Sequence, residues 1–474
     1  MKILLILVLC VVSPFYPIYG WAACLNWSGN TATVDSPYSA ALVQDCIEAA
    51  KSKIGEVTIQ IPDSTVTWAS GVTVNMRSGW GNVTGLTIRG QNDCTLDGNG
   101  RPTACGTNIT GATFAYTGEE GKAFRIAHMR MTGSSAGTQT VINIVGNGKS
   151  WRFDHIFFDT ITGAVIFRIG RTAFGHVTYG LIDHNNVQNN QYMFLHYNAN
   201  ADGGNLEWMS PLGLGTADAF YLEDNTFYMT AFSATASVVD CNGPGKFVVR
   251  YNDIHNNYLN AHDAIVTGSR GVRKWEVYNN NFTYDINGNC FVMDSRSGTG
   301  VVFNNTISDP YGVLCRGYIQ FIVYRTVTHG GEPWYPYCSN TSGKAILDTS
   351  TNYPQTCTSG TGCINIDGSS SSPSGYPCRD QLGVDGNNPQ TSRPFLLWNN
   401  TKNGGPITVG IGGGSENYIV SGRDYCLSNT TMPVSCNGVT TIYEPYTYPH
   451  PLRQAGGDTS PLVPSAPRSL RIVN

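Results

Sequence analysis

Short apolar segments alternate with polar turns along the chain, and they align on one shared register. The aligned segments span 124–131, 151–158, 180–187, 221–227, 248–254, 276–282 and 301–307, and 396–401 follows the same pattern. Their equivalent residues are Ala127, Asp154, Asp183, Glu223, Arg250, Tyr278 and Phe303, which lie 27, 29, 40, 27, 28 and 25 positions apart. The chain is therefore a repeat whose unit cannot bury its apolar side alone.

Each unit reads as strand, tight turn and strand, with one asparagine two positions beyond the aligned residue. These asparagines are Asn185, Asn225, Asn252, Asn280 and Asn305, and Asn400 extends the column. Stacked coils bring equivalent positions within about 4.8 Å, so asparagine amides can bond along a ladder. The Leu-rich repeat pattern is missing, and propeller blades need about 40 or more residues. The sequence predicts an all-β right-handed parallel β-helix, a solenoid of about 25–29 residues per coil.

Two residue types explain the expected turn. Asparagine tolerates the left-handed backbone conformation, so the column asparagines are expected to adopt it in the turn. One position earlier, His128, His155 and His184 coincide in successive coils. Stacking alone accounts for one histidine per coil, so these residues are interpreted as a ladder rather than a metal site. Arg250 also occupies a repeat position and is interpreted as structural.

The pattern divides the chain into six parts. Residues 1–23 have a basic start, an apolar run and small residues, which is typical of a secretory signal peptide. Residues 24–120 hold a capping helix at 40–50 and the first coils. Regular coils occupy 121–308, a Cys-rich excursion occupies 309–393, and strands return over 394–456. The Pro- and Ser-rich tail is 457–474.

Composition narrows the classes of protein. Of 474 residues only 13% are charged, against about 25% in an average soluble domain, and the formal net charge is −4. These values argue against coiled coil and against nucleic-acid binding, which needs a basic excess. After the signal peptide, no segment reaches the length of a membrane span.

Cysteine usage agrees with an exported chain. Thirteen of the 14 Cys lie beyond the signal segment, and five of them crowd the excursion: Cys315, Cys338, Cys357, Cys363 and Cys378. In an oxidising compartment these residues are expected to staple loops, with at least two disulfides within 309–436. The sequence therefore predicts a secreted, extracellular or cell-surface protein. It leaves the oligomeric state open.

The segments Trp151–His155 and Gly180–Asn186 resemble the W-I-D-H-type coils of pectate lyases, in the pectin-lyase-like superfamily. More broadly, the chain resembles secreted bacterial parallel β-helix proteins of unassigned activity. The segments that carry this resemblance are 248–252, 270–280, 376–381 and 446–452. The pectate lyase R-x-P-x-x-R segment and the polygalacturonase N-T-D, G-H-G and R-I-K set are missing, so no known catalytic site transfers residue by residue.

The resemblance implies a groove on the strand that precedes the ladder strand of each coil. On that strand and its following turn lie the residues expected to catalyse (Asp240, His262, Arg270 and Arg273) and those expected to bind substrate (Asp263, Asp294 and Arg296). Cations beside carboxylates suit β-elimination of an acidic sugar: a cation or Ca²⁺ neutralises the sugar carboxylate while His or Arg removes a proton. The cofactor is otherwise unknown.

Three functions fit these observations. The protein is a polysaccharide lyase, or it binds a polysaccharide or cell-surface glycan without cleaving it, or it is a glycoside hydrolase in which Asp240 and Asp294 serve as the two carboxylates.

Overall fold

A computed structural model describes most of the chain between residues 24 and 454. The described residues are 24, 26–133, 140–170, 178–190, 192–198, 205–230, 236–262, 271–286, 291–310, 321–324, 338–339, 344–347, 355–358, 380, 382–386, 391–412, 419–440 and 442–454. Among them no helix is long and apolar enough to cross a membrane. The expected signal segment, Asp263, Arg270 and the side chains of the five clustered Cys fall outside this description.

Most of the described chain forms three series of parallel strands. The first series runs β2 (Thr31–Thr33), β3 (Gly55–Ile61), β6 (Val83–Gly90), β11 (Ala123–Thr132), β13 (Trp151–Asp159), β15 (Gly180–Asp183), β18 (Phe220–Glu223), β21 (Lys246–Arg250), β24 (Lys274–Tyr278), β27 (Thr299–Phe303), β35 (Phe395–Trp398) and β39 (Tyr425–Ser428). The second runs β4 (Ser64–Thr67), β9 (Thr107–Thr110), β16 (Asn186–Gln188), β19 (Thr226–Tyr228), β22 (Asp253–His255), β25 (Asn281–Thr283), β28 (Thr306–Ser308) and β36 (Thr401–Lys402). The long strands β11 and β13 pair with both series, which together form one sheet, called sheet A here.

The third series is a separate parallel sheet, called sheet B here. It contains β5 (Val72–Asn75), β10 (Phe114–Gly118), β12 (Thr140–Gly146), β14 (Val165–Gly170), β17 (Leu195–Asn198), β20 (Val239–Asn242), β23 (Leu259–Ala261), β26 (Met293–Ser295), β29 (Phe321–Tyr324) and β38 (Val409–Gly412). The chain passes from sheet B to the two arms of sheet A and back, once per repeat. The mainly-β prediction with long parallel sheets is confirmed, and this is the arrangement expected of a parallel β-helix.

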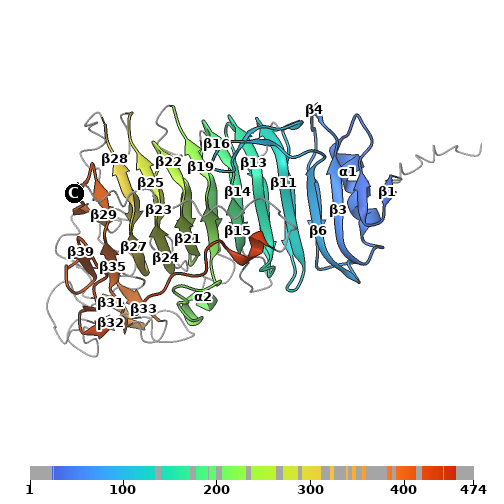
Figure 1. Cartoon of the computed structure of the whole chain (residues 1–474). Coiled ribbons are helices and arrows are strands. Elements are labelled where there is room, and N and C mark those ends of the chain that lie inside the picture. Colours follow the sequence, from blue (N-terminus) through green and yellow to red (C-terminus); the bar gives the residue numbers. More distant parts are fainter. Residues whose placement is uncertain are drawn as a thin grey trace, which may run out of the picture.

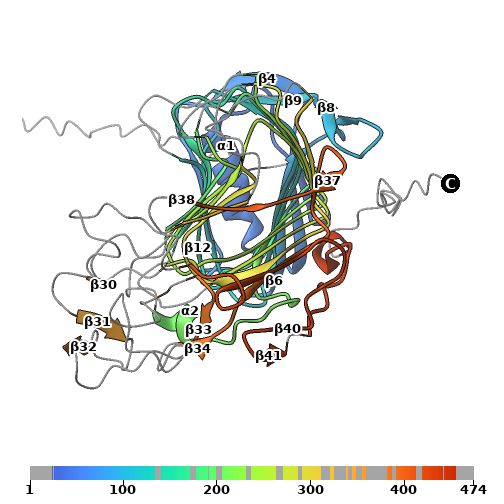
Figure 2. The ribbon, with the colours of Figure 1, turned by 90° about the vertical axis from the view of Figure 1, so that its left-hand side faces the viewer.

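The remaining helices and strands are not members of these three series. They are β1 (Trp27–Ser28), α1 (Ala40–Ala50), β7 (Thr95–Leu96), β8 (Pro102–Ala104), α2 (Asn205–Met209), β30 (Cys338–Ser339), β31 (Lys344–Leu347), β32 (Gln355–Thr358), β33 (Val384–Asp385), β34 (Thr391–Ser392), β37 (Gly405–Pro406), β40 (Ser435–Cys436), β41 (Val439–Thr440) and a 3-10 turn, η1 (Pro451–Arg453). Figure 1 shows the strands stacked side by side, and Figure 2 shows the three walls around one interior.

The helix α1 lies at the N-terminal end of the stack, where the first coil would otherwise expose its apolar edge (Figure 1). The Ser39 side chain caps it by accepting a hydrogen bond from the backbone N–H of Leu42. Its apolar face, including Val43 and Ile47, is buried in the main core, and Cys46 forms a disulfide with Cys24. The helix spans the range that the sequence pattern predicts, from residue 40 to residue 50.

The asparagine column holds the turn between the two arms of sheet A. The backbone N–H and the side-chain amide of Asn225 both donate to Oδ1 of Asn252, at 2.9 and 3.0 Å, and Asn252 bonds to Asn280 in the same way. The same pattern links Asn185 to Asn225, Asn280 to Asn305 and Asn305 to Asn400.

The left-handed residue of this turn is not the column asparagine, which corrects the sequence interpretation. It is the preceding residue: His184, Asp224, Tyr251, Asn279, Asn304 and Asn399 have φ between 50° and 59°. The asparagine instead satisfies buried backbone groups with its amide, which both donates and accepts hydrogen bonds.

The C-terminal segment, residues 442–454, returns along the outer face of the first series (Figure 1). Arg250 donates to the backbone carbonyls of Tyr446 and Thr447, at 2.7 and 2.8 Å. Arg453, in η1, pairs with Asp224 at 3.1 Å and with Glu223 at 3.5 Å. This segment, called the C-terminal strap here, therefore closes over charged side chains of sheet A.

Candidate functional site

Sheet B presents alternating side chains to the core and to the outside, as a strand must. Phe167, Leu195, Val239, Leu259 and Met293 are aligned in register and fully buried in the core. The next position on each strand faces the other way and is polar. These residues are Asn143, Arg168, His196, Asp240, Asn260 and Asp294 on successive strands.

A second polar column lies two residues further along. It contains Asn242, His262 and Arg296. The backbone N–H of His262 donates to the carbonyl of Cys241 at 3.0 Å, and that of Arg296 donates to the carbonyl of Ala261 at 2.9 Å, so both residues continue the parallel ladder. Together these side chains form what is called the sheet B polar cluster: Arg168, His196, Asp240, Asn242, Asn260, His262, Asp294 and Arg296.

His262 lies between a carboxylate and a guanidinium. Its Nε2 is 2.8 Å from Oδ1 of Asp240, and its Nδ1 is 3.0 Å from Nη1 of Arg296. A guanidinium only donates, so Nδ1 accepts this hydrogen bond and the proton of the neutral ring belongs on Nε2. Asp240 faces Nε2 of His262 as an ion-pair contact, and this nitrogen makes no hydrogen bond with any described residue. Asp240 and Arg296 therefore select one tautomer of His262.

Arg296 is held from the opposite side by Asp294. Its Nε and Nη2 donate to the two carboxylate oxygens of Asp294, at 3.2 and 2.7 Å, and Nη2 also reaches Oδ1 of Asn260 at 3.5 Å. A two-point contact fixes the plane of the guanidinium as well as its position. As a result, Nη1 of Arg296 is aimed at His262.

On the other side of Asp240, Asn242 bridges to His196. The Asn242 amide nitrogen is 3.1 Å from Oδ1 of Asp240 and 3.2 Å from Nε2 of His196. Burial is the largest influence on His196 and lowers its pKa below the ordinary value, with Arg168 acting in the same direction and Asp240 against it. The ring of His196 is consequently neutral near pH 7.

Burial separates the supporting groups from the groups that solvent reaches. The Asp240 and Asp294 side chains are 6% and 4% exposed, whereas those of His262 and Arg296 are 14% and 12% exposed. The carboxylates therefore lie below, and the imidazole and guanidinium lie at the accessible edge. At this accessible edge the Arg296 guanidinium can face a bound anion while the His262 imidazole transfers a proton.

Four of the seven predicted site residues come together here: Asp240, His262, Asp294 and Arg296. Arg273 does not join them. It immediately precedes β24 of sheet A, its guanidinium lies 4.7 Å from the ring centre of Trp208, and it forms an ion pair with Asp385. Its side chain is only 2% exposed because α2 covers it, so it has no access to the cluster. Asp263 and Arg270 lie outside the described residues.

The sequence interpretation also missed four members of the cluster: Arg168, His196, Asn242 and Asn260. The signal that identifies the first two is the register of sheet B itself, because His196 and Arg168 stand at the position of Asp240 one and two coils earlier, respectively. Reading that register as carefully as the asparagine column would have found them.

Calcium does not fit the described cluster. A Ca²⁺ site needs six to eight oxygen ligands, and the cluster offers two carboxylates, of which Asp294 already binds the Arg296 guanidinium through both oxygens. The positive charge already occupying that position disfavours a second cation.

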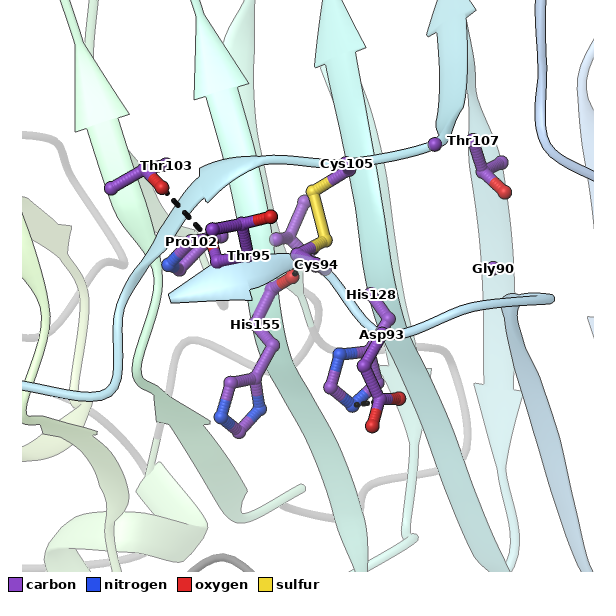
Figure 3. The surroundings of a disulfide bond; sticks show 12 residues. Gly90, Asp93, Cys94, Thr95, Pro102, Thr103, Cys105, Thr107, His128 and His155 are labelled. Carbon is purple, nitrogen blue, oxygen red and sulfur yellow. Dashed lines mark hydrogen bonds and ion pairs between the residues drawn. A yellow bond between two sulfur atoms is a disulfide. The ribbon is translucent and has the colours of Figure 1, made fainter. Parts of the chain in front are cut away.

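The histidine column is a second place where a metal could be considered (Figure 3). Ligand atoms of His128, Asp154 and His155 lie within 4.8 Å of one another. However, the rings of His128 and His155 are stacked at 4.7 Å with 14° between their planes, and a metal must lie in the plane of each ring that binds it. Asp154 is moreover bound by Arg125 through two hydrogen bonds of 2.6 and 2.5 Å. The geometry agrees with a stacked ladder.

Comparison with known proteins adds little. No protein-family model matches the chain, and no curated protein matches it. Among solved structures, the catalytic domain of a GH87 alpha-1,3-glucanase in complex with tetrasaccharides matches at a TM-score of 0.35, with 10% sequence identity, over 85% of this chain and 68% of that chain. Likeness at this level supports no inference about activity.

Proposed function

We propose that this chain is an exported right-handed parallel β-helix protein that cleaves an acidic polysaccharide by β-elimination at the sheet B polar cluster. The observation that carries the proposal is His262, which is held between Asp240 and Arg296 on neighbouring coils. The disulfides Cys24–Cys46, Cys94–Cys105 and Cys426–Cys436 support an oxidising, extracellular compartment.

In this mechanism a sugar carboxylate displaces Nδ1 of His262 as the partner of Arg296 Nη1. The guanidinium neutralises the carboxylate and so makes the neighbouring C5 proton more acidic. Nδ1 of His262 then accepts that proton, while Asp240 keeps the other ring proton on Nε2 and stabilises the imidazolium that forms. The C–H electrons become the C4=C5 double bond, the C4–O bond breaks, and the leaving oxygen takes a proton from water.

Asp294 has a positioning role in this scheme. Its two contacts with Arg296 hold the guanidinium at the level of the imidazole. Without them, Arg296 would have to be ordered again each time substrate binds, which costs side-chain entropy.

Hydrolysis is the second candidate, and one observation favours it. Asp240 and Asp294 stand in register on β20 and β26 with β23 between them, about 10 Å apart at the spacing of parallel strands. Inverting glycosidases separate their two carboxyl groups by about 6.5–9.5 Å, and side chains can close the small difference.

The decisive measurement is the product formed from a panel of acidic polysaccharides. Elimination creates an unsaturated uronate that absorbs ultraviolet light, and we expect this absorbance. His262→Gln should lower the rate by about a hundredfold or more, because it removes the base. His255→Gln is the matched control, since His255 lies on β22 in the second series of sheet A and should keep full activity.

Other products would contradict elimination. New reducing ends without ultraviolet absorbance would establish hydrolysis. Saturable glycan binding with neither product would establish a binding protein, the remaining alternative from the sequence.

A further inference from the structure

Arg168 and His196 belong to the sheet B polar cluster but have no part in the proposed chemistry. They are directly paired neighbours on β14 and β17, one coil apart. His262 directly follows β23, the neighbour of β20 in sheet B, so Arg168 stands three coils away from it, about 14 Å at the spacing of parallel strands. These two residues therefore occupy the far end of the same outer face.

Both residues carry a buried nitrogen that has no hydrogen-bond partner in the described part of the chain. These atoms are Nε of Arg168 and Nδ1 of His196. Arg168 also forms no ion pair with any described residue, whereas Arg296 of sheet B and Arg152 and Arg250 of sheet A do. Buried polar groups in folded proteins are almost always paired, so two adjacent exceptions need an explanation.

The protonation state of His196 makes its Nδ1 a hydrogen-bond donor. The Asn242 amide nitrogen donates to Nε2 of His196, so the proton of the neutral ring is on Nδ1. Nε of Arg168 always carries a proton. Two N–H groups without acceptors thus stand side by side, and next to them Oδ1 of Asn242 is a buried acceptor that also lacks a described partner.

We infer that Arg168 and His196 form a second subsite, which binds the carboxylate of another sugar unit of the same acidic glycan. This inference rests on the proposed function and specifies its substrate: a chain with acidic groups on more than one nearby sugar unit, lying across the strands of sheet B. The carboxylate oxygens accept from Arg168 and His196, and a sugar hydroxyl donates to Asn242. A guanidinium beside a neutral donor is suited to a planar anion.

Binding measured on the full chain carrying His262→Gln, which removes turnover, tests the inference. The probes are uronate oligomers of two and six units, prepared from galacturonate, mannuronate and guluronate, together with the methyl-esterified hexamers. Adding Arg168→Gln should weaken binding of one of the acidic hexamers at least tenfold and leave the dimer unchanged. Adding Arg130→Gln is the matched control, because Arg130 pairs with Asp159 on sheet A, and it should leave every affinity unchanged.

Two results would overturn the subsite. One is equal hexamer affinity with and without Arg168→Gln. The other is an equal loss for the esterified hexamer, which would mean that Arg168 recognises hydroxyl groups rather than carboxylates. As an independent readout, the His196 imidazole resonance should shift when the acidic hexamer saturates the chain and should not shift with the dimer.

The subsite and the proposed elimination can fail independently of each other. In the chain that retains His262, Arg168→Gln should raise KM for a polyuronate more than it lowers kcat. If the hexamer binds in an Arg168-dependent way and no unsaturated product ever forms, the subsite stands and the elimination proposal fails. If elimination occurs with an unchanged KM, the reverse holds. If no oligomer binds at all, both proposals are wrong.

Discussion

The outer face of sheet A and the outer face of sheet B are built by the same repeat, yet they treat their charges differently. On sheet A, Arg152 donates twice to Asp183 at 2.8 Å, and Arg250 donates twice to Glu223 at 2.8 and 2.6 Å. The C-terminal strap then supplies Arg453 and several carbonyls. On sheet B, the charges at one end are paired, and the N–H groups at the other end are not.

The difference shows what each face is for. Charges that leave water are tolerated when their donors and acceptors are satisfied, which is the condition of the Arg152–Asp183 and Arg250–Glu223 pairs on sheet A. A face that leaves donors without acceptors is destabilised until something else supplies the acceptors. We therefore read the sheet A columns as structural and the sheet B polar cluster as a place for a ligand.

The largest expected effect tests this contrast with two arginines. Arg250→Ala should lower the free energy of unfolding by about 3–5 kcal/mol, because it leaves the Glu223 carboxylate buried without its partner and strips two carbonyls of the strap of their donor. Arg168→Ala should change the same quantity by less than about 1 kcal/mol, since no described partner is lost. Urea denaturation of both variants measures the difference. Equal losses would abolish the distinction between the two faces.

A smaller effect is expected in the asparagine column, which stabilises the turn between the arms of sheet A. Asn252→Leu should cost about 1–3 kcal/mol, because the backbone N–H of Asn225 and the carbonyl of Leu222 lose their partner. Asn281→Leu is the control, since Asn281 is the next residue after the column residue Asn280 and is exposed on β25. A loss at Asn281 as large as that at Asn252 would show that the column has no special role.

Much of sheet A could be predicted from the sequence because its information is local. Each coil repeats one spacing, so aligning Asp183, Glu223 and Arg250 by sequence also names residues that pair in space. The capping helix follows from its own apolar periodicity. Even so, the pattern placed the left-handed conformation one residue too late. Both the turn residue and the asparagine next to it are polar, and only the backbone distinguishes them.

The site was harder to predict because its contacts depend on segments between the repeats. Arg273 has the same local pattern as a groove arginine, and it is removed from the cluster by α2, which lies more than 60 positions earlier in the chain. The C-terminal strap meets Asp183 through Arg453, about 270 positions later, and no local pattern encodes that contact. The sequence predicts at least two disulfides within 309–436. Cys426–Cys436 is one such bridge, and the side chains of the five excursion cysteines lie outside the described residues.

The smallest expected effect is a pH dependence of folding stability that arises from His128 on sheet A. Burial is the largest influence on His128 and lowers its pKa to about 4; His155 and Arg89 act in the same direction, whereas Asp154 and Asp93 oppose it. The unfolded chain takes up a proton near pH 6.5 and the folded chain does not, so stability is complete above that pH and is lost as pH falls toward 4. Between pH 6.5 and 5.5 this loss amounts to about 1 kcal/mol.

His128→Asn isolates that contribution, because asparagine accepts the left-handed backbone of His128, with φ of 57°, and does not titrate. Burial also raises the pKa of Asp224 to about 6, which favours the folded chain as pH falls and opposes the trend. Both proteins contain Asp224, so the difference between their unfolding free energies removes its effect. The unfolding free energy of the unchanged chain minus that of His128→Asn is expected to fall by about 1 kcal/mol from pH 6.5 to 5.5. A constant difference would mean that the folded and unfolded chains take up the His128 proton equally, and burial in the stack would then not lower the pKa of His128.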